Sequence, residues 1–289
     1  MPRDRFLQIF WNLHLCDPSV GSGSPRSTKV QPLLDLLCPK FETAFKLGEY
    51  IAVDEAMIAF RGRASFRQYI RGKPHPFGIK AFVLADSKTG YMYRVRLYFG
   101  SETDLIEEPG LLQTTRTVLT LTQPLEGRGH HVITDRFYTS PELAMELERR
   151  GLAFTGTAQI NRRGMPLAIK YSGRIKLPKG SVRAYCAGKT MALQWQDKRT
   201  IILLSTTESS TCIQVQTRRG QLKEVPKVVK VYNDYMLGVD KMDQLATYYS
   251  FLRKSVKWWR KVLFWLLEVS VINSYMVTLA GYTLLGGDL

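Results

Sequence analysis

Three aspartates, Asp54, Asp135 and Asp240, have the type and placement that chemistry on phosphate esters would need. They stand 81 and 105 residues apart, so only the tertiary fold could bring them together. Carboxylate oxygens suit Mg²⁺ and Mn²⁺, and a cluster of them can hold two such ions about 3.5–4 Å apart in enzymes that displace at phosphorus. Spacing alone leaves a second interpretation open, in which each aspartate is a solvated surface residue.

The local sequence predicts a defined element around each of these aspartates. Asp54 lies in a run over 50–60 whose apolar residues alternate with period two, which is typical of a β-strand. Asp135 ends a short apolar strand over 131–135, and Asp240 stands at the start of a helix. Because functional groups gather at the carboxyl ends of strands in open α/β sheets, we expect the three carboxylates to meet there.

The segment after Asp135 carries the clearest helix signal in the chain. Ser140 is an N-cap residue, Pro141 suits the first helical position, and Glu142 places an acid in the first turn. Gly151 is the expected end of this helix. The sequence therefore predicts a strand, a loop with Asp135 at its beginning, and then a helix.

The remaining apolar patterns predict a mixed α/β chain. Helices are expected over 4–15, 29–47, 111–121 and 258–280, and Pro39 is expected to break the second of them. Further strands are expected over 79–85 and 91–99, joined by a turn at 86–90 that contains Asp86, so that the early strands form an antiparallel meander. Residues 152–230 contain short apolar runs between basic turns and no long helix, which indicates a β-rich module.

The charge of the chain favours a polyanionic partner. Lys and Arg total 41 against 25 acids, which gives a net charge of +16 and points first to nucleic acid and second to an acidic membrane surface. The excess is uneven, because residues 161–230 hold 15 Lys and Arg and 3 acids. The stretch 61–80 adds six Lys and Arg with no acid beside the strand of Asp54.

The sequence gives little support to a zinc-binding or disulfide-rich protein, or to a membrane protein. The four cysteines form no Cys-x-x-Cys pair, so the sequence predicts neither a zinc site nor a disulfide scaffold, and a reducing compartment fits it best. Residues 262–282 have the length of a membrane span and follow a Trp- and Lys-rich flank, but Glu268 and Asn273 dilute the segment. We therefore predict a buried helix there and no membrane partner.

Longer sequence motifs around the aspartates resemble those of the piggyBac transposase family. The first runs from Asp54-Glu55 through Phe60-Arg61-Gly62-Arg63 and Phe66-Arg67-Gln68-Tyr69 to Gly78-Ile79-Lys80. The second is Thr134-Asp135-Arg136-Phe137-Tyr138-Thr139-Ser140, and the third is Tyr232-Asn233 with Gly238-Val239-Asp240 and Asp243-Gln244. These motifs occur in the family's order over nearly the whole chain. Such an ordered set of motifs is far more specific for a family than three isolated acids.

The resemblance implies a fold and a domain order. It implies an α/β, RNase H-like catalytic core at 48–155 and 229–245, interrupted by a β-rich basic insertion domain at 156–228. It implies that helical regions at 1–47 and 246–289 form a DNA-binding and dimerisation region. A homodimer in the nucleus is expected.

The resemblance also implies an activity and its residues. Asp54, Asp135 and Asp240 would bind Mg²⁺ or Mn²⁺ as a two-metal site, with Asp243 as an added catalytic acid and no zinc in this chain. The reaction would cleave and transfer double-stranded DNA, with insertion at TTAA. The expected DNA-binding residues are Arg61, Arg63, Arg67, Lys73, Lys80, Arg162, Arg163, Arg253, Lys254, Lys257, Trp258 and Trp259.

The chain departs from the family pattern at its ends. Family members carry a longer N-terminal segment and a Cys/His-rich zinc module that reads the transposon end, and neither is present in these 289 residues. An alternative function therefore stays open: a domesticated, transposase-derived protein that binds DNA without complete transposition.

Overall fold

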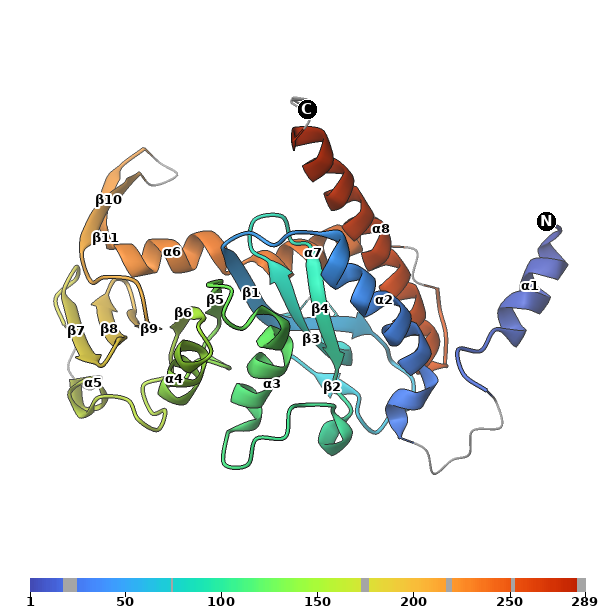
Figure 1. The fold of residues 1–289 in the computed structure, drawn as a ribbon, viewed down its shortest axis with the longest axis horizontal. Coiled ribbons are helices and arrows are strands. Elements are labelled where there is room, and N and C mark those ends of the chain that lie inside the picture. Colours follow the sequence, from blue (N-terminus) through green and yellow to red (C-terminus); the bar gives the residue numbers. More distant parts are fainter. Residues whose placement is uncertain (18–24, 74, 173–176, 217–219, 251–252, 285–289) are drawn as a thin grey trace.

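A computed structural model describes residues 1–17, 25–73, 75–172, 177–216, 220–250 and 253–284 (Figure 1). Its α-helices are α1 (Arg3–Asn12), α2 (Gln31–Ala44), α3 (Gln113–Thr122), α4 (Pro141–Arg149), α5 (Leu167–Ser172), α6 (Lys227–Tyr235), α7 (Gly238–Tyr248) and α8 (Trp258–Leu284). Its strands are β1 (Tyr50–Ala59), β2 (Gln68–Tyr69), β3 (Phe77–Asp86), β4 (Met92–Leu97), β5 (His131–Thr134), β6 (Ala153–Thr157), β7 (Val182–Ala187), β8 (Thr190–Gln196), β9 (Thr200–Ser205), β10 (Cys212–Gln216) and β11 (Leu222–Pro226). The predicted mixed α/β class is confirmed.

A nine-stranded mixed sheet forms the centre of the molecule. Its order is β2-β3-β1-β5-β6-β9-β8-β7, with β4 also paired to β3. Strands β1, β5 and β6 are parallel neighbours, whereas β1, β3 and β4 form the predicted antiparallel meander. The turn between β3 and β4 is held by Asp86, whose Oδ1 accepts hydrogen bonds from the backbone N–H groups of Lys88 and Thr89. Asp86 is therefore a turn residue, as its sequence context predicts.

The core sheet continues into the segment predicted as an insertion domain. Strand β9 pairs antiparallel with β6, with Thr155 opposite Ser205, and β8 and β7 follow at the edge. Only β10 and β11 form a separate two-stranded sheet among the strands that the structure describes. The described part of the segment is rich in strands and contains the short helix α5, and α6 begins at its end. The division of the chain at 155 and 228 into domains stays a prediction.

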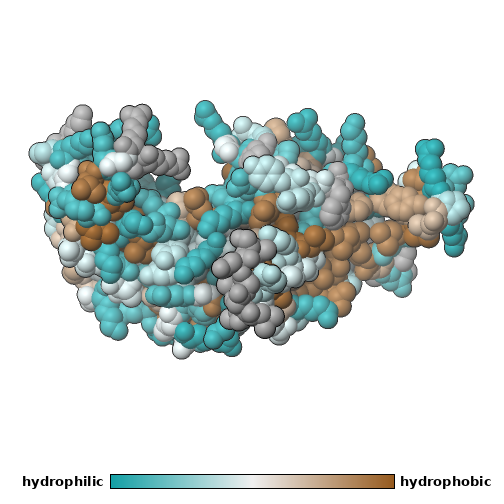
Figure 2. Space-filling model, turned by 90° about the horizontal axis from the view of Figure 1, so that it is seen from above, coloured by the Kyte–Doolittle hydropathy of each residue, from teal (hydrophilic) through white to brown (hydrophobic). Residues whose placement is uncertain are grey.

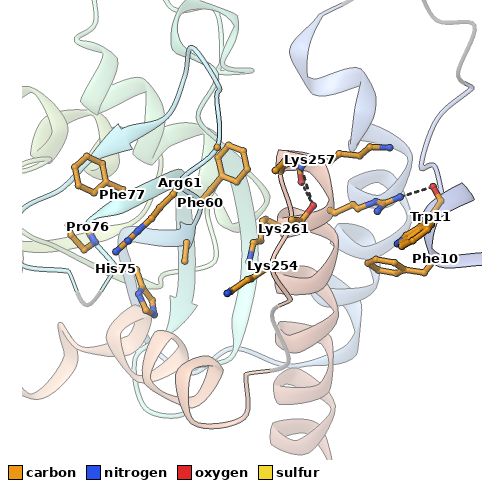
Figure 3. Close-up of a pocket in the computed structure, with 15 residues that line it drawn as sticks. Phe10, Trp11, Phe60, Arg61, His75, Pro76, Phe77, Lys254, Lys257 and Lys261 are labelled. Carbon is orange, nitrogen blue, oxygen red and sulfur yellow. Dashed lines mark hydrogen bonds between the residues drawn. The ribbon is translucent and has the colours of Figure 1, made fainter. Parts of the chain in front are cut away.

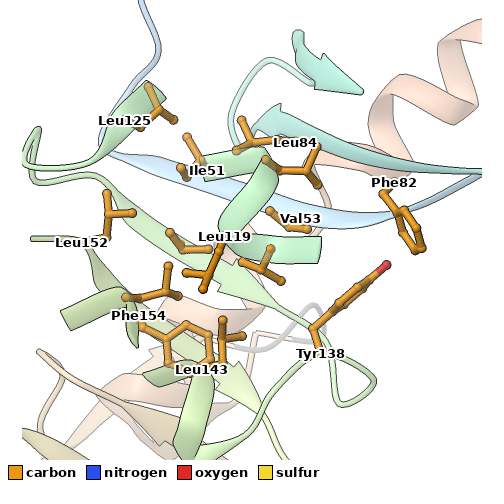
Figure 4. Packing of buried hydrophobic residues seen from close by; sticks show 14 of the residues in the cluster. Ile51, Val53, Phe82, Leu84, Leu119, Leu125, Tyr138, Leu143, Leu152 and Phe154 are labelled. Atoms are coloured by element: carbon orange, nitrogen blue, oxygen red, sulfur yellow. The ribbon is translucent and has the colours of Figure 1, made fainter. Parts of the chain in front are cut away.

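Helices cover both faces of the sheet and create its hydrophobic cores. On one face, Leu119 of α3 and Leu143 of α4 pack against Ile51 and Val53 of β1 and Leu84 of β3 (Figure 4). On the other face, α2, α7 and α8 pack against the alternate residues of β1 and β3. Successive side chains of β1 face opposite cores, so Asp54 lies on the same side of the sheet as Ala56 and Ile58, the side covered by α7.

The predicted break at Pro39 is wrong. Helix α2 runs from Gln31 to Ala44 with Pro39 inside it. Cys38 and Phe41, on either side of the proline, are buried in the core. Tertiary packing therefore outweighs the cost of the lost backbone hydrogen bond.

Helix α8 is long and apolar enough to cross a membrane over Trp258–Tyr282, but half of its most apolar window is buried inside the fold. Asn273 is buried and pairs with both backbone groups of Met92, its Oδ1 accepting from the N–H at 3.0 Å and its Nδ2 donating to the carbonyl at 2.9 Å. This buried polar pairing fits a core helix, as predicted. Apolar surface remains, however, and in Figure 2 it gathers on the side that carries α1 and α8.

Candidate active site

Asp54 and Asp135 lie side by side on neighbouring parallel strands. Val53 of β1 is in register with Thr134, the last residue of β5, so Asp54 follows this pair within β1 and Asp135 follows it directly after the end of β5. Adjacent strands are about 4.8 Å apart, so the two residues begin from adjacent backbone positions. The pairing of two strands that are 81 residues apart in the sequence creates this proximity.

A folded-back loop fixes the position of Asp135. Its Oδ1 accepts a hydrogen bond from the Phe137 N–H at 2.8 Å, and its carbonyl accepts from the Thr139 hydroxyl at 2.7 Å. The Thr139 and Thr134 hydroxyls are 2.8 Å apart, directly over Gly156 of β6. A Cβ at Gly156 would lie 2.2 Å from the Thr139 hydroxyl, so only glycine leaves room for the loop there.

The start of α7 brings Asp240 and Asp243 to the same region. Gly238, two residues before Asp240, packs so closely on the sheet that a Cβ would lie 3.0 Å from the Asp86 carbonyl oxygen and 3.2 Å from the Ala52 Cβ. Ala52 is two residues before Asp54 on β1 and therefore shares its face. Gly238 thus seats the helix start against the strand that carries Asp54.

A lysine side chain lies among these carboxylates. The Lys73 ammonium is 3.3 Å from Oδ1 of Asp240 and 3.8 Å from Oδ2 of Asp243. Burial alone would lower the pKa of Lys73, but the charges of Asp54, Asp243 and Asp240 together raise it. Lys73, predicted from sequence as a DNA-binding residue, is in this structure the cation on which three acids act.

The carboxylates are crowded and partly withdrawn from water. Burial raises the pKa of Asp54, and its hydrogen bond with Glu55 adds to the rise. Burial also raises the pKa of Asp135, although the Phe137 N–H opposes this, and it raises the pKa of Asp243 to about 7. A nearby cation lowers the pKa of such carboxylic acids and so favours their ionised form.

The donor set has the chemistry that suits a hard divalent cation, because the carboxylates of Asp240 and Asp243 pair with the Lys73 ammonium and the charge of Asp54 also acts on it. In the arrangement of the described residues, no group of three or more His, Cys, Asp or Glu side chains is placed to hold a metal ion. Binding would therefore require Lys73 to give up its ion pairs. The predicted metal set of Asp54, Asp135 and Asp240 stays a prediction, with Lys73 as the group to be displaced.

The predicted DNA-binding residues fall into two groups. Some serve the protein itself: Lys80 pairs with Glu55 at 2.9 Å, and Arg67 donates to the carbonyl of Arg61. Arg162 donates to the carbonyls of Arg136 and Phe137, in the loop of Asp135. Trp259 is buried in the hydrophobic core and Trp258 is half-buried against it, and their role in DNA binding stays a prediction.

The other predicted residues present charge outward. Arg63 and Arg163 are exposed, and the Arg253 guanidinium lies over the Phe6 ring of α1. The side chains that line one wide cavity include Arg61, Lys254 and Lys257 (Figure 3). The cavity's exposed aromatic residues, Trp11 and Phe77, were missed by sequence reasoning, because both stand in short apolar patterns that resemble ordinary core positions.

Comparison with known families decides the relationship of this chain. The sequence profile of a family described as Transposase IS4 matches residues 1–275. This chain belongs to that transposase family. The resemblance to piggyBac transposases is confirmed, and the three motifs that carry Asp54, Asp135 and Asp240 lie within the matched residues.

Relatives of this transposase-family chain include two human proteins. It is 29% identical to human PiggyBac transposable element-derived protein 3 and 25% identical to human PiggyBac transposable element-derived protein 2, over 96% and 95% of its length. It covers 48% of each of them, so the chain spans about half the length of these relatives.

A solved structure confirms the fold. A piggyBac transposase in a synaptic complex with hairpin DNA superposes with a TM-score of 0.87 at 27% sequence identity. The match covers all of this chain and 59% of that one. The mixed sheet with its flanking helices is thus the piggyBac fold with its RNase H-like core, as the resemblance implied.

Proposed function

We propose that this chain is the catalytic core of a piggyBac-type transposase that cleaves and transfers DNA strands at TTAA sites with divalent metal ions. Two observations support the proposal, one that relates Asp54 on β1 to Asp135 after β5 and one that relates Asp54 to the acids of α7 through Lys73. Asp54 and Asp135 follow a register pair on adjacent strands, and Asp54, Asp240 and Asp243 act together on one ammonium. Membership of a transposase family makes DNA the substrate to test.

The side chains of the site would have different roles in this reaction. Asp54, Asp135 and Asp240 would hold Mg²⁺ or Mn²⁺, which when bound supplies charge neutralisation at the phosphate and activates the attacking water. The Phe137 N–H orients the Asp135 carboxylate, and Gly238 fixes the approach of Asp240. Asp243, whose pKa is raised to about 7 by burial, is placed to accept or hold a proton beside them.

Lys73 would take a second role once its acids engage a metal ion. Its ammonium is the mobile end of a long side chain, and its two ion pairs span 3.3 and 3.8 Å. Released from Asp240 and Asp243, it would be free to contact a DNA phosphate, which reconciles its present place with the DNA-binding role expected from sequence.

A second function, DNA binding without complete transposition, also has support. The net charge of +16 supplies sequence-independent affinity for the phosphate backbone whether or not the acids are active. The human relatives are named as transposable element-derived proteins. For both functions we propose double-stranded DNA as the partner and the nucleus as the location. We also propose that the chain forms a homodimer through residues 1–47 and 246–289.

A cleavage assay separates the two functions. End-labelled duplex carrying piggyBac-type terminal repeats next to TTAA is incubated with the purified chain in Mg²⁺, Mn²⁺ or EDTA, beside a scrambled duplex. The transposase core is expected to nick DNA only with a divalent metal. Binding of both duplexes with no metal-dependent nicking would instead establish the DNA-binding protein.

A further inference from the structure

A wide cationic cleft, separate from the carboxylates, lies between the β1–β3 region and the α1–α8 pair (Figure 3). Its volume is about 800 Å³, within the range of ligand sites in proteins. Its charged lining side chains are Arg61, Lys254, Lys257, Arg260 and Lys261, and its lining contains no Asp or Glu. Over the described part of the chain, no ion pair engages Arg61, Lys254 or Lys257. The lining of the cleft therefore carries positive charge that no acidic lining residue compensates.

Aromatic rings stand on opposite sides of this cleft. Trp11 lies on the α1 side and Phe77 on the sheet side, and 64% and 43% of their surfaces are exposed (Figure 3). Exposure of this much apolar ring surface costs free energy in water. The Arg67 guanidinium lies 5.7 Å from the centre of the Phe77 ring and the Tyr69 ring lies 4.8 Å from it, so Trp11 is the more open of the two rings. Cations beside exposed aromatic rings are the combination that binds single strands, because phosphates meet the cations and bases stack on the rings.

The wall that carries Trp11 is held in place by buried contacts. The Arg260 guanidinium, 7% exposed, donates to the Trp11 carbonyl at 2.9 Å and lies 4.8 Å from the centre of the Phe10 ring. Phe10 in turn stacks on Phe264 of α8 at 6.0 Å. These contacts fix the backbone of α1 and leave the indole of Trp11 outside the core.

The cleft adjoins the carboxylate site. Ala59 and His75 line both the cleft and a smaller cavity of about 360 Å³. That smaller cavity is also lined by Lys73, Asp240 and Asp243. A DNA strand that lies along the cleft would therefore lead directly to the acids.

We propose that this cleft binds unpaired nucleotides of a DNA strand next to the cleavage site. Lys254, Lys257 and Arg61 hold its phosphates, and Trp11 and Phe77 stack on its bases. Unpaired DNA is favoured over duplex because base faces are covered in a helical stack and open only when bases are unstacked. The proposal shares with the proposed function the choice of DNA as partner, but it does not depend on cleavage.

Fluorescence anisotropy in EDTA tests the cleft without any cleavage. The 289-residue chain is titrated into a labelled single strand, the same strand with abasic positions, and the matching duplex. Trp11→Ala is expected to weaken binding of the intact single strand about 5- to 150-fold, the range for one stacked base, and to change binding of the abasic strand and the duplex less than twofold. Lys254→Ala is expected to weaken all three and to reduce the salt dependence.

Tyr171→Ala provides the matched control, because Tyr171 is equally exposed, at 65%, on the distant helix α5. It should leave every affinity unchanged. Two results would contradict the binding of unpaired nucleotides in the cleft. One is an equal loss of affinity for single strand and duplex in Trp11→Ala, and the other is equal affinity of the unaltered chain for the abasic and the intact strand. Either result would leave the proposed function unaffected. Absence of any DNA binding would overturn both proposals.

Discussion

Replacement of Asp135 by Asn is expected to abolish metal-dependent nicking of DNA, with a loss of at least about 1000-fold, as for groups that act as one catalytic unit. The amide keeps the shape of the side chain and can still accept from the Phe137 N–H. It lacks the negative charge that a divalent ion requires beside Asp54. The measurement is the rate of strand nicking in Mg²⁺ and Mn²⁺ under single-turnover conditions.

The control for Asp135→Asn is Asp104→Asn. The Asp104 side chain is 86% exposed, lies 3.7 Å from Arg96 and belongs to none of the proposed sites, so that variant should nick at the rate of the unaltered chain. Duplex binding in EDTA should be equal in all three proteins. If Asp135→Asn nicked DNA as fast as Asp104→Asn, Asp135 would have no part in catalysis.

Replacement of Gly156 by Ala is expected to lower the free energy of unfolding by about 3 kcal/mol, the upper end for overpacking a rigid core. The new Cβ would lie 2.2 Å from the Thr139 hydroxyl and 2.8 Å from the Thr134 carbonyl oxygen. The first neighbour is held by hydrogen bonds to the Thr134 hydroxyl and the Asp135 carbonyl, and the second belongs to the backbone of β5, so neither can move aside freely. Urea denaturation measures the loss, and nicking should fall with it because the loop must move.

Gly281→Ala in α8 is the matched control. No atom lies within 4 Å of the Cβ that it would add, and alanine favours a helix over glycine by about 1 kcal/mol, so stability should stay equal or rise. An unfolding free energy for Gly156→Ala within error of the unaltered chain would show that the loop is not packed on β6 as described.

The sequence predicted much of this fold because local patterns determined it. A few adjacent residues were enough to predict the strand of Asp54, the short strand before Asp135 and the helix that begins at the Ser140–Pro141 cap. The cap is present as expected, with the Ser140 side chain accepting from the Leu143 N–H. Pro39 was misinterpreted because its local cost is offset by burial of Cys38 and Phe41, which only tertiary packing reveals.

The site was less accessible to sequence reasoning. Lys73 and Asp240 are 167 residues apart, and their ion pair depends on the seating of α7 on β1 by Gly238. Trp258 and Trp259 form a conspicuous aromatic pair next to lysines, yet Trp259 is buried and Trp258 is half-buried, while Trp11 near the other end of the chain is more exposed. Which cations and rings share a surface follows from long-range packing rather than from composition.

The meeting of Asp54, Asp135 and Asp240 at one metal site is tested most directly by iron-mediated cleavage of the protein itself. Fe²⁺ is added in place of Mg²⁺ with ascorbate and peroxide, and the cut positions are mapped by mass spectrometry. The account predicts backbone cuts close to residues 54, 135 and 240 together, suppressed by excess Mn²⁺ and lost in Asp135→Asn. Cuts near only one of these aspartates, or cuts that Asp135→Asn leaves unchanged, would contradict it.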